Sequence, residues 1–197
     1  MNDPAAGGGS APPPPSRILL VGFMASGKSA VGREVARLLG WRFVDFDVEI
    51  RRETGQDIAD VFAVAGEAGF RAVEARVARR LLRQDRAVLA SGGGWAAQPG
   101  HMEGLARDTL SVWLKVTAET AVERARQQRA ERPLLNVPQP VEHARRLLAR
   151  REPCYRLARL TLDSENVSVA ALAGRIASLA RQSIEPATSS PATAHPS

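Results

Sequence analysis

Residues 17–39 read RILLVGFMASGKSAVGREVARLL, and this stretch decides the fold. After Arg17 the first residues form an uninterrupted apolar run, which is typical of a short buried strand. A glycine-containing loop follows. Beyond it, apolar side chains recur at the spacing of one face of a helix, at Val31, Val35, Leu38 and Leu39. The stretch therefore predicts a strand, a loop and a helix in direct succession.

The loop itself, GFMASGKS at residues 22–29, matches the P-loop pattern G-x-x-x-x-G-K-[ST] at every fixed position. Phosphate oxygens need several converging donors, and the backbone N–H groups at a helix N-terminus supply them. We expect Lys28 to neutralise the β- and γ-phosphates and the Ser29 hydroxyl to bind Mg²⁺. The predicted nucleotide-binding residues are Gly22, Ala25, Ser26, Gly27, Lys28, Ser29 and Ala30.

A P-loop identifies a nucleotide but not the acceptor, since GTPases, nucleoside kinases and motors all carry one. The chain has no guanine-reading N-K-x-D sequence, which argues against a GTPase. The acceptor has to be inferred from other residues.

The rest of the chain alternates between strand and helix patterns. Strands are predicted at residues 43–46, 87–90, 109–116 and 160–162. Helices are predicted at residues 48–54, 58–82, 118–128, 141–151 and 169–181, with breaks near Gly55 and around 66–69. Alternation of this kind favours a three-layer α/β/α fold around a five-stranded parallel sheet, with ligands at the carboxyl ends of the strands.

Composition limits the class of protein. At 197 residues the chain fits one domain, which we place at residues 17–182, between disordered tails at 1–16 and 183–197 that are rich in Pro, Ser, Ala and Gly. The net charge of +6 suits anionic ligands, but an aromatic content of 5% argues against nucleic acid. With no signal peptide, no apolar span and a single cysteine, we expect a cytoplasmic protein without a membrane partner.

Two features after the strands suggest an acceptor site. Asp45 and Asp47 lie two residues apart at the predicted end of the second strand, so both carboxylates should point toward the ligand crevice. One could reach Mg²⁺ through water while the other accepts a proton from an attacking hydroxyl; capping of the next helix is the alternative. Gly92, Gly93 and Gly94 follow the third strand and allow close approach of a ligand, although a plain turn is also consistent with them.

Three arginines stand out by their context, namely Arg71 after Phe70, Arg132 before Pro133, and Arg156 after Tyr155. Arginine pairs such as those at 79–80, 145–146 and 150–151 are interpreted instead as solvated surface residues.

Taken together, these pieces resemble the shikimate kinase family from about residue 17 to residue 181. The resemblance rests on GFMASGKSAVGREVARLLG, FVDFDVEI, TGQDIADVFAVAGEAGFRAVE, LASGGG, RPLL and PCYRLA, in this order. It implies a nucleoside monophosphate kinase-like fold and transfer of the γ-phosphoryl group of ATP to the 3-hydroxyl of shikimate, with Mg²⁺, in a monomeric enzyme of aromatic amino acid biosynthesis.

The resemblance also implies roles for individual residues. Asp45 would lie near the metal, and Asp47 would bind the ring hydroxyls and serve as the base. Arg71 and Arg156 would bind the substrate carboxylate, and the glycine triplet would contact the substrate through backbone N–H groups. Arg132 would come from a lid, at about residues 129–140, that closes over the phosphates, so Lys28, Asp47 and Arg132 form the expected catalytic set.

Some points remain open at this stage. Ala30 and Trp95 depart from the residues usual in the family, and Arg124, Arg126 and Arg129 are equal candidates for the adenine contact. The rival interpretations are a related kinase acting on gluconate or a nucleoside monophosphate, and a catalytically silent nucleotide-binding regulator.

Overall fold

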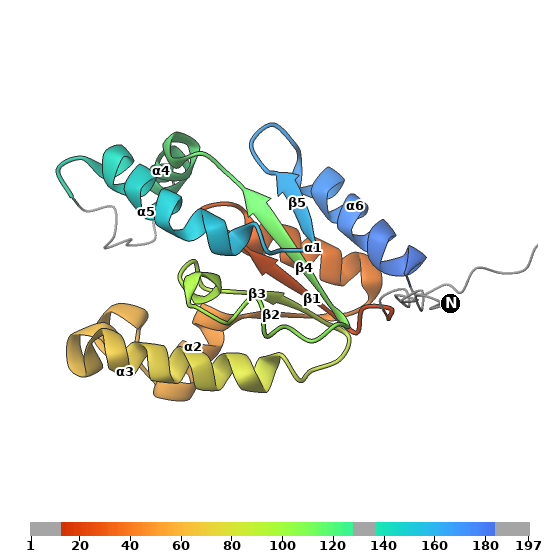
Figure 1. Ribbon diagram of the computed structural model, residues 1–197, viewed down its shortest axis with the longest axis horizontal. Helices are drawn as coiled ribbons and strands as arrows, with labels where there is room; N and C mark the ends of the chain where they lie inside the picture. The colour runs from red at the N-terminus through yellow and green to blue at the C-terminus, as the bar shows by residue number, and fades with distance from the viewer. Residues whose placement is uncertain (1–12, 128–136, 184–197) are drawn as a thin grey trace, which may run out of the picture.

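A computed structural model describes residues 13–127 and 137–183 as three layers around a parallel sheet (Figure 1). The strands follow one another in the order β2-β3-β1-β4-β5, and all neighbouring pairs are parallel. Their bounds are Arg17–Val21 for β1, Arg42–Asp45 for β2, Ala87–Ala90 for β3, Thr109–Lys115 for β4 and Leu160–Asp163 for β5. The predicted fold class is therefore confirmed.

Helices cover both faces of the sheet. Along the chain they are α1 Lys28–Leu39, α2 Phe46–Thr54, α3 Ile58–Leu81, the short 3-10 helix η1 Trp95–Ala97, α4 Ala118–Gln127, α5 Pro140–Tyr155 and α6 Val169–Gln182. Figure 1 shows α1 and α6 together on the right, α2 and α3 at the lower left, and α4 and α5 at the upper left. Among the helices of the described ranges, none is both apolar and long enough to cross a membrane.

Alternation along the strands divides the core into two clusters. Ile18 and Leu20 of β1 face α1 and α6, whereas Leu19 and Val21 face the layer that contains α2, α3, α4 and α5. All four side chains are fully buried, as expected for a central strand covered on both faces.

The order of the strands in the sheet indicates where a ligand would bind. The chain moves from β1 to β2 on one side, and after β3 it crosses to β4 on the other side of β1. In a parallel sheet this reversal opens a crevice at the carboxyl ends of the strands. The loops after β1, β2 and β3, which carry the predicted site residues, therefore meet at one edge.

Most predicted boundaries lie within two residues of the observed ones, but α5 is an exception. The sequence predicted the end of this helix at Arg151. In the structure α5 continues through Pro153 to Tyr155. The predicted breaks are present: Gly55 caps α2 in a left-handed conformation, and Gly66, with φ 66°, kinks α3.

Most of each predicted tail lies outside the described residues. The same is true of Arg132 and of most of the predicted lid. The predicted domain limits and the lid therefore stay predictions.

A buried arginine ties the amino ends of the strands together, opposite the crevice. Arg17 is 6% exposed, and its guanidinium donates to Asp85 at 2.9 Å, to Asp108 at 2.8 Å and to the backbone oxygen of Gln84. Asp108 also accepts from the Ser16 hydroxyl at 2.6 Å. Hydrogen bonds from Ser16 and then from Arg17 lower the pKa of Asp108 below its ordinary value of 3.8.

Replacing Asp108 with Asn should lower the free energy of unfolding by about 1 kcal/mol at neutral pH, because the buried guanidinium loses a charged partner. Because the pKa of Asp108 is lower in the folded protein than its value of 3.8 in the unfolded chain, the carboxylate stabilises the fold at pH above 3.8. This contribution is lost as the pH falls through the pKa of the folded protein. Wild type and variant should therefore converge in acid. Urea unfolding at a series of pH values measures this.

Asp85, whose side chain is 73% exposed, provides the control. Asp85→Asn should change the free energy of unfolding by less than about 0.5 kcal/mol. Equal effects of the two substitutions would contradict the assignment of Asp108 as the stronger partner of Arg17.

Candidate active site

The P-loop follows β1 and wraps tightly against the neighbouring strand. Gly22 has φ 140°, and a Cβ at this position would lie 2.6 Å from the backbone oxygen of Leu114, so only glycine fits. Ala25, with φ 55°, lies in the left-handed backbone region that residues other than glycine rarely adopt. Gly27 opens α1, whose free N–H groups face the loop. This is the geometry that phosphate binding needs.

The Lys28 ammonium lies over the loop. Its Nζ donates to the backbone oxygens of Gly22 at 2.9 Å and Phe23 at 2.8 Å, with Ser26 Oγ at 3.5 Å. Ser26 is buried and Ala30 is exposed on α1. These contacts hold the Lys28 ammonium against the backbone of the loop, and its role in binding phosphate stays a prediction.

Ser29 and Asp45 form a pair of oxygen ligands. The Ser29 hydroxyl donates to Asp45 Oδ2 at 2.6 Å, and Asp45 Oδ1 accepts from the backbone N–H of Asp47 at 3.0 Å. Hydroxyl and carboxylate oxygens are donors that Mg²⁺ prefers. Within the described ranges no group of three or more acidic, His or Cys side chains could hold a metal by itself. The pair could supply two of the ligands of an ion whose remaining ligands come from water and a nucleotide, such as nucleotide-bound Mg²⁺.

The local geometry of the two aspartates differs from the prediction. We expected both at the end of an extended strand, but β2 ends at Asp45, which caps α2, and Asp47 lies in the first turn of that helix. Capping and an acidic pair, which the sequence offered as alternatives, are both present. The helix begins this early because Asp45 satisfies a free N–H at its start.

Asp47 is a strong candidate for a proton acceptor. Burial, followed by repulsion from Asp45, raises its pKa from 3.8 to about 6; Glu74 acts in the same direction, while Lys28 and Arg51 oppose it. A carboxyl group with a pKa near the working pH can both take up and release a proton.

The glycine triplet lies between this acidic group and the P-loop. A Cβ on Gly92 would lie 3.1 Å from Asp47 Oδ1 and 3.0 Å from Glu74 Oε1. A Cβ on Gly93 would lie 3.5 Å from the backbone N of Met24, and one on Gly94 would lie 3.0 Å from the Arg71 guanidinium. The loop after β3 therefore meets the P-loop, Asp47 and Arg71 within a few ångströms.

Arg71 is held by a buried carboxylate. Its guanidinium donates to Glu74 at 2.7 Å and approaches the exposed Glu67 at 3.5 Å. Glu74 is 2% exposed, and burial raises its pKa although Arg71 acts in the opposite direction. Arg71 Nε is buried without a hydrogen-bond partner among the described residues. The arginine is thus fixed in place with donor capacity left over.

A second arginine reaches the triplet, and it is not the predicted one. Arg151 donates to the backbone oxygen of Gly93 at 3.1 Å, and the Tyr155 hydroxyl donates to the same oxygen. Both residues lie on α5, four positions apart and therefore on one face. We had interpreted Arg151 as a surface residue.

Arg156 occupies a different position. Its side chain is 66% exposed, and it donates to Glu152 at 2.6 Å. The structure therefore corrects the predicted arrangement: the arginine of α5 that meets the glycine triplet is Arg151. The helical spacing of Arg151 and the aromatic Tyr155 could have revealed this, had α5 been predicted through Pro153.

Trp95 and Arg124 were left open by the sequence. Trp95 is 3% exposed, and its ring packs edge-on against Phe46 and stacks on His101, so it supports the triplet from the core. Arg124 donates to the backbone oxygens of Ser164 at 2.7 Å and Glu165 at 3.1 Å, just after β5. It thus joins α4 to the carboxyl edge of the sheet.

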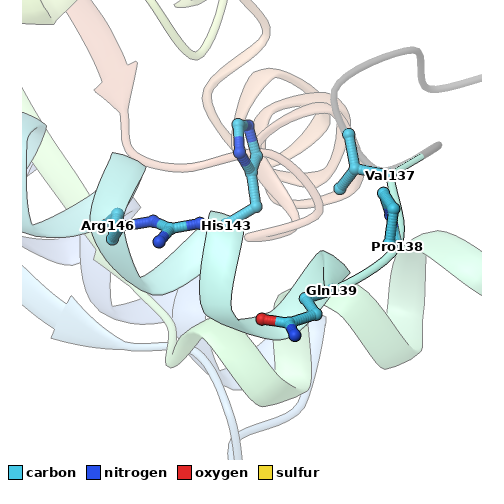
Figure 2. Close-up of a pocket in the computed structure, with 5 residues that line it drawn as sticks. All are labelled: Val137, Pro138, Gln139, His143 and Arg146. Carbon is cyan, nitrogen blue, oxygen red and sulfur yellow. The ribbon is translucent and has the colours of Figure 1, made fainter.

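A surface hollow of about 230 Å³ lies elsewhere, where α5 begins (Figure 2). It is lined by Val137, Pro138, Gln139, His143 and Arg146. None of these is a predicted binding or catalytic residue, although Val137, Pro138 and Gln139 belong to the predicted lid at about residues 129–140. Arg151 and Tyr155 project from the opposite end of the same helix, so the hollow is not part of the site described above.

Comparisons with known proteins agree with the resemblance found in the sequence. The family model described as shikimate kinase matches residues 24–181. A shikimate kinase of Nitrobacter winogradskyi is 44% identical over 150 residues, which are 76% of this chain and 70% of that protein. One of Halorhodospira halophila is 41% identical over 170 residues, 86% and 92% of the two chains. A solved structure, a shikimate kinase from Acinetobacter baumannii in complex with shikimate, superposes with a TM-score of 0.79 at 38% identity and covers 85% of this chain and 94% of that one.

Asp47→Asn should raise the free energy of unfolding by about 1–2 kcal/mol at neutral pH. The pKa of Asp47 is about 6 in the folded protein against an ordinary 3.8, so the loss of stability grows as pH rises from 3.8 to 6 and is constant above about 6. Both states are protonated below 3.8, where the gain should vanish. Urea unfolding at several pH values measures it.

Asp45→Ala serves as the matched control. It removes the cap of α2 and should lower the free energy of unfolding by about 1 kcal/mol. If Asp47→Asn is destabilising by a similar amount at every pH, Asp47 does not carry the unfavourable charge assigned to it.

Proposed function

The chain belongs to the shikimate kinase family, and on this basis we propose that it transfers the γ-phosphoryl group of ATP to the 3-hydroxyl of shikimate, giving shikimate 3-phosphate and ADP. One observation carries the proposal. The glycine triplet brings Asp47 and Arg71 together and touches the P-loop through Gly93. This proximity supports assigning Asp47 as the base, Arg71 as an anion-binding group and the P-loop as the phosphate site of one reaction.

At the nucleotide end, the P-loop N–H groups and Lys28 would hold the β- and γ-phosphates. Ser29 and Asp45 would hold Mg²⁺, which when bound neutralises charge on these phosphates. Arg132, which we predict to lie on the lid, would also neutralise charge on these phosphates. Arg124 on α4, which donates to the backbone oxygen of Ser164 just after β5, is our choice for the adenine contact. Most of the acceleration would come from positioning and charge neutralisation, as in other phosphoryl transfers.

At the acceptor end, shikimate offers a ring of hydroxyl groups and one carboxylate. Asp47 would accept a hydrogen bond from the attacking 3-hydroxyl and take up its proton as the new P–O bond forms. Arg71 and Arg151 would bind the carboxylate, since a planar guanidinium can bind it in a bidentate manner. Arg151 replaces Arg156 in this role.

We also propose that the enzyme acts in the cytoplasm as a monomer, with residues 17–182 as its kinase domain, and serves aromatic amino acid biosynthesis. The support is the family membership. Size-exclusion chromatography with light scattering tests the oligomeric state.

Shikimate should stimulate release of ADP from MgATP, whereas gluconate and nucleoside monophosphates should not, because only the first matches the acceptor residues. A coupled assay for ADP over this panel of acceptors makes the measurement. Turnover of gluconate or a nucleotide without a response to shikimate would overturn the proposal, and no turnover with any acceptor would favour the regulatory alternative.

Arg151→Ala should raise the KM for shikimate by about 10- to 100-fold, since loss of a charged hydrogen bond costs about 1.5–3 kcal/mol. Arg156→Ala, at the exposed C-cap of the same helix, is the matched control and should leave this KM within about twofold. Steady-state kinetics with saturating MgATP provide both values. A large effect of Arg156→Ala beside a small one of Arg151→Ala would restore the original sequence prediction.

A further inference from the structure

The one tyrosine of the chain, Tyr155, has no role in the mechanism above although it reaches the same site. We propose that Tyr155 is a positioning residue: its hydroxyl fixes the Gly93–Gly94 peptide so that the Gly94 N–H stays directed at the acceptor. The inference rests on the proposed function, because it concerns the acceptor site of that reaction. The observations that support it are the two hydrogen bonds to the Gly93 carbonyl oxygen.

A peptide between two glycines needs an external anchor. Without Cβ atoms on either side, the Gly93–Gly94 plane can rotate with little steric resistance. Within the described ranges, the backbone N–H groups of Gly93 and Gly94 donate to no protein acceptor. The turn hydrogen bond from the Trp95 N–H to the Gly92 oxygen closes around this peptide but allows either of its two orientations, type I or type II. The contacts to the Gly93 carbonyl oxygen select between them.

Two donors hold that oxygen, the Tyr155 hydroxyl and the Arg151 guanidinium at 3.1 Å. They differ in what happens when an acceptor binds. A carboxylate is a much stronger partner for Arg151 than a neutral carbonyl, so in the proposed complex Arg151 is drawn toward the acceptor. Tyr155 would then be the donor that remains on the Gly93 oxygen.

Tyr155 is suited to this task because it cannot move. It is 0% exposed and packs beside Trp113, with ring centroids 6.0 Å apart. Its phenol has two torsions and both are restricted by packing, whereas Arg151 is longer and more flexible.

Because the peptide group is planar, fixing the direction of the Gly93 oxygen also fixes the direction of the Gly94 N–H. The Gly93–Gly94 peptide is trans, so its N–H points away from its carbonyl. With the oxygen turned toward Tyr155, the Gly94 N–H is directed to the opposite side. Gly94 lies beside the Arg71 guanidinium, with only 3.0 Å between a Cβ built there and the nearer nitrogen. The donor and Arg71 could thus serve the same anionic or hydroxyl-bearing ligand.

Tyr155→Phe removes the hydroxyl and keeps the ring. Its KM for shikimate should rise about tenfold while the KM for MgATP and kcat change by less than about threefold. The apoprotein should unfold at nearly the same temperature, since Arg151 still donates to Gly93. The increase in melting temperature on adding shikimate should fall to less than half of the wild-type increase.

Ser111→Ala is the matched control. Ser111 is a buried hydroxyl on β4 that accepts from the backbone N–H of Arg159 at 3.1 Å, away from the triplet. This variant should lose stability with and without shikimate alike and keep the wild-type KM. A Tyr155→Phe enzyme that behaves like Ser111→Ala would overturn the proposal, because the hydroxyl would then be a structural group only.

The wild-type chain allows a test that needs no substitution. Since Tyr155 is the single tyrosine, uniform 3-fluorotyrosine labelling gives one ¹⁹F resonance from this ring. Saturating shikimate should shift it, and ADP alone should not, because the shared contact with Arg151 changes only with the acceptor. An unshifted resonance in a protein that turns over shikimate would refute the positioning role, whereas a protein without shikimate turnover would refute the proposed function itself.

Discussion

Close approach of one backbone to another at the carboxyl edge of the sheet is the constraint on which the site depends. Gly22 lies against the oxygen of Leu114, and Gly93 lies against the N–H of Met24. A side chain at Gly22 would push the P-loop off the edge of β4, and the loop after β3 would then lose its neighbour. The distance between the phosphate site and the acceptor site is therefore set by backbone contact and not by mobile side chains, which suits a reaction that depends on alignment.

Charge within this frame is balanced at some cost to the fold. Burial raises the pKa of both Asp47 and Glu74, so each carboxylate would be more stable in water. Arg71 offsets part of that cost for Glu74, but Asp47 has no guanidinium within hydrogen-bond distance among the described residues. Stability is thus lowered at the group that the proposed reaction needs as a base, as is common at functional sites.

The sequence predicted the fold, and it singled out most of the residues that the structure brings together, because the informative residues are local. The P-loop spacing, the apolar strands and the glycine triplet each act through neighbouring backbone. Two predictions of local placement were wrong. Asp47 was placed on a strand, although Asp45 caps the helix that holds it. Arg151 was assigned to the surface as one of a pair of helical arginines, yet tertiary packing carries α5 through Pro153 to Tyr155. Propensity alone cannot report that packing.

The partners of the two arginines also bear on which acceptor is selected. Arg71 is paired with Glu74, and Arg151 donates to the Gly93 carbonyl oxygen. An acceptor has to offer Arg151 something better than a neutral carbonyl, and a carboxylate does so whereas a hydroxyl does not. A neutral polyol could fill the crevice but would gain little from displacing that contact. Discrimination would thus arise at α5 and the triplet, because the P-loop treats all acceptors alike.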